Sequence, residues 1–325
     1  MLLYSAALLA GFLVLFKSAD YFVIGSVATA NNFSISPMLI GLTVVALGTS
    51  APEIFVAATS SLQGNAEIAV GNAIGSNIAN IGMVLGITAV LVPLQIHPDI
   101  LKNDIPILIF VTLSAGAALM DYKLELWDGL LLLVGLVIFL ARFALEHRKT
   151  SSIELASEIA DIDEFPEMST AKSVGILTGS LLALLVSSEL VVWSVSHIAV
   201  AMGVSELVIG LTVIAVGTSL PELVVSVASA LKGQTDLAFG NIVGSNIFNI
   251  LAVLSIPCVL APRQFDPELM WRDYACMFMM TAVLVIFSYG FKRRIGRIQG
   301  FILLGLWFSY LFVLYRASIH LPHPH

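Results

Sequence analysis

Ten long apolar segments restrict the fold of this chain more than any other feature of its sequence. Charged residues, proline or glycine separate them, and they cover residues 2–31, 37–62, 67–92, 104–120, 126–145, 174–201, 206–231, 236–260, 272–289 and 297–315. A transmembrane helix needs about 20 mainly apolar residues. We therefore predict an all-α integral membrane protein with ten transmembrane helices. The first segment lacks the basic start and the cleavage site of a secretory signal, so we retain it as a helix.

The composition excludes several classes of protein. Only 11% of the residues are charged and 58% are hydrophobic, with a mean hydropathy of +0.97, whereas soluble domains contain about 25% charged residues. These values exclude a water-soluble fold and a disordered chain. The net charge of −7 leaves no basic surface for a phosphate backbone, so no nucleic-acid partner is expected. Cys258 and Cys276 are too few for a disulfide framework and are predicted to be apolar packing residues.

A polar, strongly acidic stretch divides the chain into two halves of five segments each. We predict a domain at 1–145, a linker at 146–172 and a second domain at 173–325. Ten lysines and arginines fall on the linker's side of the membrane and four on the other side. Because basic loops stay in the cytoplasm, the linker is expected there, with both termini outside. The membrane would be the plasma membrane or a bacterial or archaeal inner membrane.

The two halves contain a repeated block of sequence. Residues 41–80 align with 210–249 without a gap, and 22 of the 40 positions are identical at a constant offset of 169. Since each half has an odd number of spans, the second copy enters the membrane from the opposite face. This pattern predicts two inverted five-helix repeats. In secondary transporters with such repeats, the substrate site lies near the membrane midplane at the repeat interface.

Polar residues concentrate in the repeated block and predict a site for hard cations. Glu53 and Glu222 lie about 16 residues inside their spans, where an ionisable side chain is costly unless it has a function. The prolines at 52 and 221 remove a backbone donor and should free carbonyls near Ala46, Leu47 and Gly48 and near Ala215, Val216 and Gly217. Carboxylate, carbonyl, hydroxyl and amide oxygens are the ligands that Ca²⁺ prefers. Hydroxyls come from the Thr-Ser pairs before each proline, and amides come from Asn72, Asn77, Asn80, Asn241, Asn246 and Asn249.

Other polar residues in the spans have less certain roles. Asp20 and Glu189, which are also equivalent at the offset of 169, either contribute to a cation entry path or, for Asp20, pair with Lys17 three residues earlier. His197 is interpreted as a residue of a helix interface. The glycines of the Gly-x-x-x-Gly pairs, taken alone, are explained by close helix packing.

The duplicated motifs resemble a known family. Gly-x-Thr-Val-x-Ala-x-Gly-Thr-Ser-x-Pro-Glu and Gly-Asn-x-x-Gly-Ser-Asn-x-x-Asn each occur twice. They are similar to the α-repeats of the cation/calcium exchanger superfamily, specifically the prokaryotic type of sodium/calcium exchanger with two α-repeats. The resemblance implies ten helices, with spans 2, 3, 7 and 8 forming the ion-binding core and spans 1 and 6 sliding against it.

The same resemblance implies roles for matching positions. Glu53 and Glu222 would be the calcium-binding carboxylates and would also bind sodium. Thr49 and Thr218 would contribute to the calcium site. The flanking sodium sites would use the hydroxyls of Ser50, Ser219, Ser76 and Ser245 and the carbonyls of Ala46 and Ala215. Asn80 and Asn249 would line the centre. Some relatives carry aspartate at one of these two central positions, so asparagine at both disfavours potassium co-transport.

The resemblance implies a sodium/calcium antiporter that works by alternating access and extrudes calcium electrogenically. No resident cofactor is expected, since calcium and sodium are cargo, and the pattern is compatible with a monomer. Proton coupling stays an alternative. The proton-coupled branch usually has a glutamate after its Gly-Asn motif, however, where this chain has Gly-Ser-Asn. A calcium-permeable channel is a second alternative. An intramembrane hydrolase lacks a nucleophile and base beside the glutamates, so we do not expect an enzyme.

Overall fold

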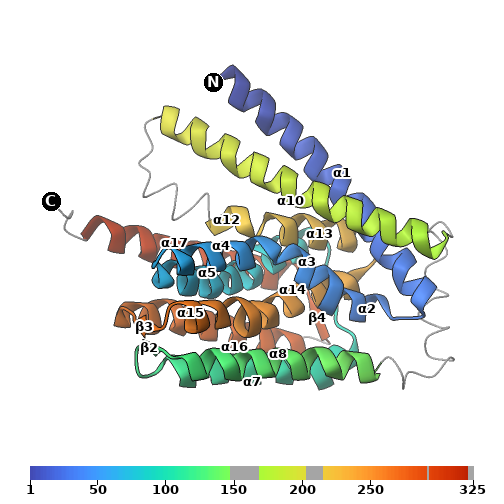
Figure 1. Cartoon of the computed structure of the whole chain (residues 1–325). Helices are drawn as coiled ribbons and strands as arrows, with labels where there is room; N and C mark the ends of the chain where they lie inside the picture. Colours follow the sequence, from blue (N-terminus) through green and yellow to red (C-terminus); the bar gives the residue numbers. More distant parts are fainter. Residues whose placement is uncertain (147–167, 203–214, 291–292, 321–325) are drawn as a thin grey trace.

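The computed structural model describes residues 1–146, 168–202, 215–290 and 293–320, and it is helical almost throughout (Figure 1). In the first half, in which η denotes a π-helical turn, the elements are α1 (Leu2–Phe33), α2 (Pro37–Ile40), η1 (Gly41–Val45), α3 (Ala46–Thr49), α4 (Ala51–Leu62), α5 (Ala66–Ala79), η2 (Asn80–Leu85), α6 (Gly86–Leu91), β1 (Leu94–Gln95), η3 (Ile100–Asp104), α7 (Ile105–Leu119), β2 (Lys123–Leu124) and α8 (Leu126–Glu146). In the second half they are α10 (Thr170–Ala201), α12 (Ala215–Thr218), α13 (Leu220–Leu231), α14 (Thr235–Phe248), η5 (Asn249–Val253), α15 (Ser255–Leu260), β3 (Arg263–Gln264), η6 (Leu269–Tyr274), α16 (Ala275–Tyr289), β4 (Arg294–Ile295) and α17 (Arg297–His320).

The elements of the two halves recur at a nearly constant spacing. For example, α4 and α13 begin 169 residues apart, as do α5 and α14, and η2 and η5. The short strands connect the halves, because β1 pairs with β4 and β2 pairs with β3, both antiparallel. Each two-stranded sheet therefore contains one strand from each half.

Many of the helices have the length and composition of membrane spans. Seven described helices meet both criteria, and the bent pair Met38–Thr49 and Ala51–Leu62 brings the number to eight. The helix α8, with 21 residues, is also strongly apolar. Much of the predicted span 206–231 and most of the predicted linker 146–172 lie outside the described residues. The protein is thus an all-helical membrane protein, apart from four very short strands among the described residues.

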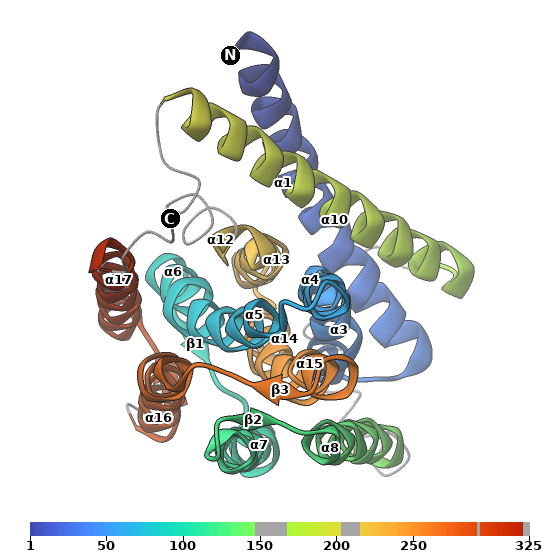
Figure 2. The same cartoon turned by 60° about the vertical axis from the view of Figure 1, so that its left-hand side comes forward.

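Two helical runs form the centre of the molecule. The run α5-η2-α6 and the run α14-η5-α15 are mostly buried, whereas α1 and α17 are mostly exposed. Large side chains such as Phe239, Phe248 and Ile74 are fully enclosed there. Figure 2 shows the other helices arranged around these two runs, with α1 and α10 crossing obliquely on one side. In a bilayer the exposed apolar side chains of the outer helices face lipid.

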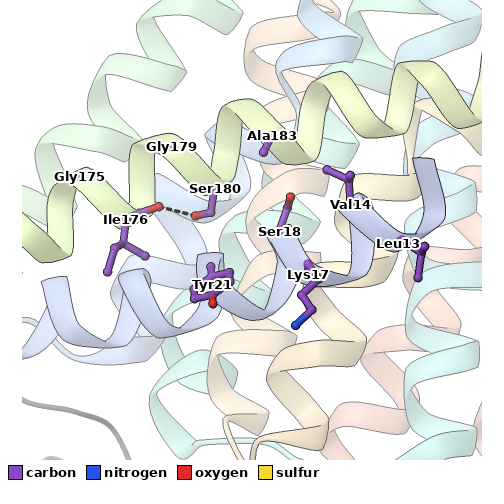
Figure 3. Close-up of a pocket in the computed structure, with 10 residues that line it drawn as sticks. All are labelled: Leu13, Val14, Lys17, Ser18, Tyr21, Gly175, Ile176, Gly179, Ser180 and Ala183. Carbon is purple, nitrogen blue, oxygen red and sulfur yellow. Dashed lines mark hydrogen bonds between the residues drawn. The ribbon is translucent and has the colours of Figure 1, made fainter. Parts of the chain in front are cut away.

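A groove between α1 and α10 lies apart from the buried centre (Figure 3). It encloses about 540 Å³ and is lined by Leu13, Val14, Lys17, Ser18 and Tyr21 of α1 and by Gly175, Ile176, Gly179, Ser180 and Ala183 of α10. None of these residues belongs to the predicted cation site. The groove is a feature of the crossing of two outer helices, and we do not assign the site to it.

Two buried acids attach the last helix of each half to the body. Asp104, at the end of η3, lies 3.8 Å from the guanidinium of Arg142 in α8. Asp273 in η6 accepts a hydrogen bond of 3.0 Å from the Tyr310 hydroxyl of α17 and also pairs with Arg272. These two acids were aligned in the sequence by the offset of 169, and both stabilise the packing of an outer helix.

Glycine allows α14 to approach the helical run that carries the first half of the site. A Cβ at Gly244 would lie 2.6 Å from the Leu42 carbonyl oxygen and 2.8 Å from the Ala46 Cβ. Small residues permit such backbone contact between membrane helices. The position of Ala46 relative to α14 therefore depends on the missing side chain at Gly244.

We predict that Gly244→Ala destabilises the protein by about 1–3 kcal/mol, as overpacking of a tight contact usually does. Thermal unfolding in detergent measures the effect. The matched control is Gly305→Ala in α17, where a Cβ would meet open space and surface changes cost about 0.5 kcal/mol or less. Equal melting temperatures for the two variants would contradict the assigned contact.

Candidate cation site

A proline breaks each of the two helical runs that carry the glutamates. Ser50 leaves the helical conformation with φ of −83° and ψ of 9°, and the helices on its two sides are bent by 41°. Ser219 has nearly the same conformation, with φ of −88° and ψ of 6°. Because Pro52 and Pro221 have no N–H, the carbonyls of Gly48 and Gly217 lose their usual helical donors. The sequence therefore produces two short helices, α4 and α13, that begin inside the protein.

Both glutamates lie in the first turn after the break. Glu53 in α4 and Glu222 in α13 are fully buried. The first turn of a helix carries partial positive charge on its free N–H groups, which favours a carboxylate there. The sequence placed Glu53 deep along one ideal helix. In the structure the bend puts it instead near the start of a second helix.

The two buried carboxyl groups come from different halves of the chain. They are close enough to interact electrostatically. Ser50, from the break in the first half, donates a hydrogen bond of 3.0 Å to Oε1 of Glu222. The hydroxyls of Ser76 and Thr218 lie near Glu53, and those of Thr49 and Ser245 lie near Glu222. Each carboxyl group is thus approached by a threonine from the opposite half and by a serine from its own half.

Many oxygen atoms at this centre have no hydrogen-bond partner. Among the described residues, these are both carboxyl oxygens of Glu53, Oε2 of Glu222, the hydroxyls of Thr218, Ser219 and Ser245, and the side-chain amides of Asn80 and Asn249. Buried polar groups are normally paired, and a cluster of unpaired ones is typical of a place where an ion or water binds. The structure shows no ion pair from a basic residue to either glutamate within the described ranges. The donor set is rich in hard oxygen ligands and carries two negative charges.

The central asparagines coincide with irregular turns. Asn80 is the first residue of η2, Asn249 is the first residue of η5, and both are fully buried. Insertions of this π-helical kind occur frequently at functional sites. The sequence did not indicate these turns, because no proline or glycine marks their start.

Ala46 and Ala215 begin the short helices α3 and α12. Of the carbonyls near Pro52 that were expected to be free, that of Ala46 accepts a hydrogen bond of 3.0 Å from the Ser50 N–H. The carbonyls that lose a helical donor are those of Gly48 and Gly217. The Gly217 oxygen accepts a hydrogen bond of 3.3 Å from Ser188 of α10, a partner that sequence reasoning missed. The Ala46 oxygen keeps a second lone pair, since a carbonyl has two.

Several other asparagines brace helices. Asn72 donates to the Glu53 carbonyl oxygen at 3.2 Å, and Asn241 donates to Ser226 at 3.0 Å. Asn246 donates to the carbonyl oxygen of Ile242, and Asn77 donates to the sulfur of Met277. The amide nitrogens of all four are therefore occupied by local contacts. The sequence suggested oxygen ligands at these positions because composition alone does not distinguish a brace from a ligand.

The alternative that Asp20 pairs with Lys17 is wrong. Asp20 instead forms an ion pair of 3.1 Å with Lys232, just beyond α13. The reason is that α1 packs along α13, which brings a residue distant in sequence beside the carboxylate. His197 lies at the interface of α10 and α1, as predicted, where its ring stacks on Tyr4 with centroids 4.8 Å apart.

Comparisons with known proteins show the family of this chain. The family model described as sodium/calcium exchanger protein matches residues 3–145 and 172–316. The chain is 44% identical to a putative antiporter, CaxA, of Alkalimonas amylolytica over 98% of this chain and all of that protein. It is 31% identical to the sodium/calcium exchanger MaX1 of Methanosarcina acetivorans, covering 95% and 97% of the two chains.

A solved structure provides the same comparison in three dimensions. The sodium–calcium exchanger NCX_Mj matches with a TM-score of 0.82 and 33% identity, over 96% of this chain and 99% of that one. The family model and the relatives each span nearly the whole sequence. This chain therefore belongs to the sodium/calcium exchanger protein family.

Proposed function

We propose that this protein exchanges sodium for calcium across a membrane by alternating access, and that the site between Glu53 and Glu222 carries the ions. The observation that supports this most directly is the cluster of unpartnered buried oxygens around two carboxyl groups. Oxygen ligands in a flexible arrangement suit Ca²⁺, which takes about 6 to 8 of them. Membership of the exchanger family supports the same assignment.

The proposed ligands are the residues expected from the sequence. Calcium is held by the carboxylates of Glu53 and Glu222 with the help of Thr49 and Thr218. Sodium also uses flanking positions formed by the hydroxyls of Ser50, Ser76, Ser219 and Ser245 and by the carbonyls of Ala46 and Ala215. Asn80 and Asn249 line the centre between them. The proximity of Ser50, Thr49 and Ser245 to Glu222 supports this set.

Charge explains why the two ions exclude one another. One divalent ion or two monovalent ions neutralise the two carboxylates, so sodium entry expels calcium when the ions share ligands. Any further sodium adds net charge, and each translocated elementary charge gains about 2.3 kcal/mol per 100 mV. Inward sodium flow then drives calcium out of the cell electrogenically.

Alternating access requires that the site open to one face at a time. In this structure neither glutamate reaches solvent, which supports an occluded site. We propose ten spans arranged as two inverted repeats of five helices, 1–145 and 173–325, joined by the linker 146–172. Two observations support this arrangement. Equivalent elements recur about 169 residues apart, and each short strand pairs with a strand of the other half. Inverted repeats let one half adopt the conformation of the other.

Calcium uptake into vesicles tests the exchange itself. Uptake should follow an outward sodium gradient, and a pH gradient of equal size should drive little. Glu53→Gln and Glu222→Gln should each reduce the uptake to background, because each removes a charge that binds the cargo. The matched control is Glu67→Gln, an exposed acid at the start of α5, which should transport normally. Uptake driven by protons alone would favour the proton-coupled alternative, and uptake without any counter-ion would indicate a channel.

Calcium should also stabilise the purified protein. A ligand at 100 times its dissociation constant adds about 2.7 kcal/mol to folding stability, so the melting temperature should rise when calcium replaces a chelator in sodium-free buffer. Glu53→Gln should lose most of this rise, and Glu67→Gln should keep it. An equal rise in both variants would show that calcium binds elsewhere.

The proposed orientation can be checked with single cysteines. We propose that the linker faces the cytoplasm and that both termini face outside. In a background without Cys258 and Cys276, Lys123→Cys should react with an impermeant maleimide added to whole cells. Lys172→Cys should react only after the membrane is permeabilised. Both lysines are exposed, so the reverse pattern would invert the topology.

A further inference from the structure

The two halves of the site differ in one hydrogen-bond network. Thr49 donates to the amide oxygen of Asn241 at 3.2 Å, and the amide nitrogen of Asn241 donates to the hydroxyl of Ser226 at 3.0 Å. All three residues are fully buried. The network joins α3 of the first half to α13 and α14 of the second, three helices that lie together in Figure 2.

The equivalent network does not form in the other half. At the offset of 169, Ser226 corresponds to Ala57, Asn241 to Asn72 and Thr49 to Thr218. Ala57 offers no hydroxyl, and Asn72 donates to the Glu53 carbonyl oxygen at 3.2 Å. The Thr218 hydroxyl has no partner in the described part of the chain. One substitution between the repeats, serine for alanine, therefore accompanies two changes in hydrogen bonding.

The Asn241 side chain is held between two hydroxyl groups. Its amide nitrogen donates to Ser226 and its amide oxygen accepts from Thr49. Ser226 lies one helical turn after Glu222 in α13. It therefore gives Asn241 a partner other than the Glu222 carbonyl oxygen, whereas the equivalent Asn72 donates to the Glu53 carbonyl oxygen.

The Asn241 oxygen gives the single proton of Thr49 an acceptor other than the Ala46 carbonyl oxygen, beside the nearby Glu222 carboxyl group. The Thr49 hydroxyl lies 3.2 Å from the Asn241 oxygen and 3.3 Å from the Ala46 carbonyl oxygen, and it has one proton to donate. Ser50 N–H already occupies one lone pair of the Ala46 oxygen. When Asn241 accepts the Thr49 proton, the second lone pair of Ala46 is available for a cation.

We propose that Ser226 is a positioning residue for sodium binding. Through Asn241 and Thr49 it keeps the Ala46 carbonyl available, and it makes the two flanking sodium positions unequal. The inference rests on the proposed function, in which Ala46 is a sodium ligand. Without Ser226, Asn241 can turn toward the Glu222 carbonyl oxygen as Asn72 turns toward that of Glu53, and Thr49 then loses the acceptor that draws its proton away from the Ala46 carbonyl oxygen.

Displacement of radioactive calcium by sodium from the purified protein tests this role. Ser226→Ala should require about three- to tenfold more sodium for half-displacement, which corresponds to the loss of one ordinary hydrogen bond. The calcium dissociation constant without sodium should change by a smaller factor than the sodium requirement, because Ala46 is proposed as a ligand of sodium alone. Ser226→Thr, which keeps the acceptor oxygen, should stay close to the wild type.

The reciprocal change provides the matched control. Ala57→Ser gives Asn72 a hydroxyl partner, and it should lower the sodium needed for half-displacement. Ala57→Ser therefore tests the effect of a hydroxyl partner for the asparagine on sodium binding, even if Ser226→Ala folds poorly. A purely structural role for Ser226 predicts instead that the larger threonine is worse than alanine.

Three results would overturn the inference: unchanged sodium competition in both Ser226→Ala and Ala57→Ser, a Ser226→Thr variant worse than Ser226→Ala, or equal shifts for calcium and sodium. If sodium fails to displace calcium from the wild-type protein, the proposed function itself fails and this inference fails with it. If sodium displaces calcium from the wild type and equally well from the variants, only this inference is refuted and the proposed function stands.

Discussion

Two carboxyl groups buried together without a basic partner in the described structure are the constraint on which the rest of the site depends. Glu53 and Glu222 are both fully enclosed, and each buried charge costs several kcal/mol in an apolar interior. The surrounding hydroxyls and amides offer oxygen atoms but no compensating charge. A cation is the simplest partner that satisfies both the charge and the unpaired oxygens. The site is therefore stable in its ionised form chiefly when it is loaded.

The prolines explain how a membrane helix can present such a site. Each proline directly precedes its glutamate, and the helix is interrupted at the serine two residues before the proline. A new helix therefore starts inside the protein in each half. Backbone that departs from the helix at membrane depth is tolerated where it lines a site buried in protein. The close approach of α14 at Gly244 then brings the broken helix of the first half against the second half. The prolines thus determine the breaks, and Gly244 permits the contact between the halves.

Much of this could be predicted from sequence, and the failures have a common cause. Long apolar segments, the duplicated motif and the helix-breaking prolines are local signals, and they located the helices and placed Glu53 and Glu222 in one candidate site. Contacts between distant elements left no such signal. The pairing of Asp20 with Lys232 and the bracing role of Asn241 both depend on which helix packs beside them. The difference between Ser226 and Ala57 was visible in the alignment, but its consequence required the positions of three helices.

The most direct test of the central claim is an anomalous difference map from crystals grown with calcium in place of sodium. The account predicts one peak between the carboxyl groups of Glu53 and Glu222, within about 2.3–2.6 Å of an oxygen from each, and its disappearance when saturating sodium replaces calcium. A calcium peak that lies elsewhere, or one that persists unchanged in saturating sodium, would contradict the claim that both ions use this pair of carboxylates.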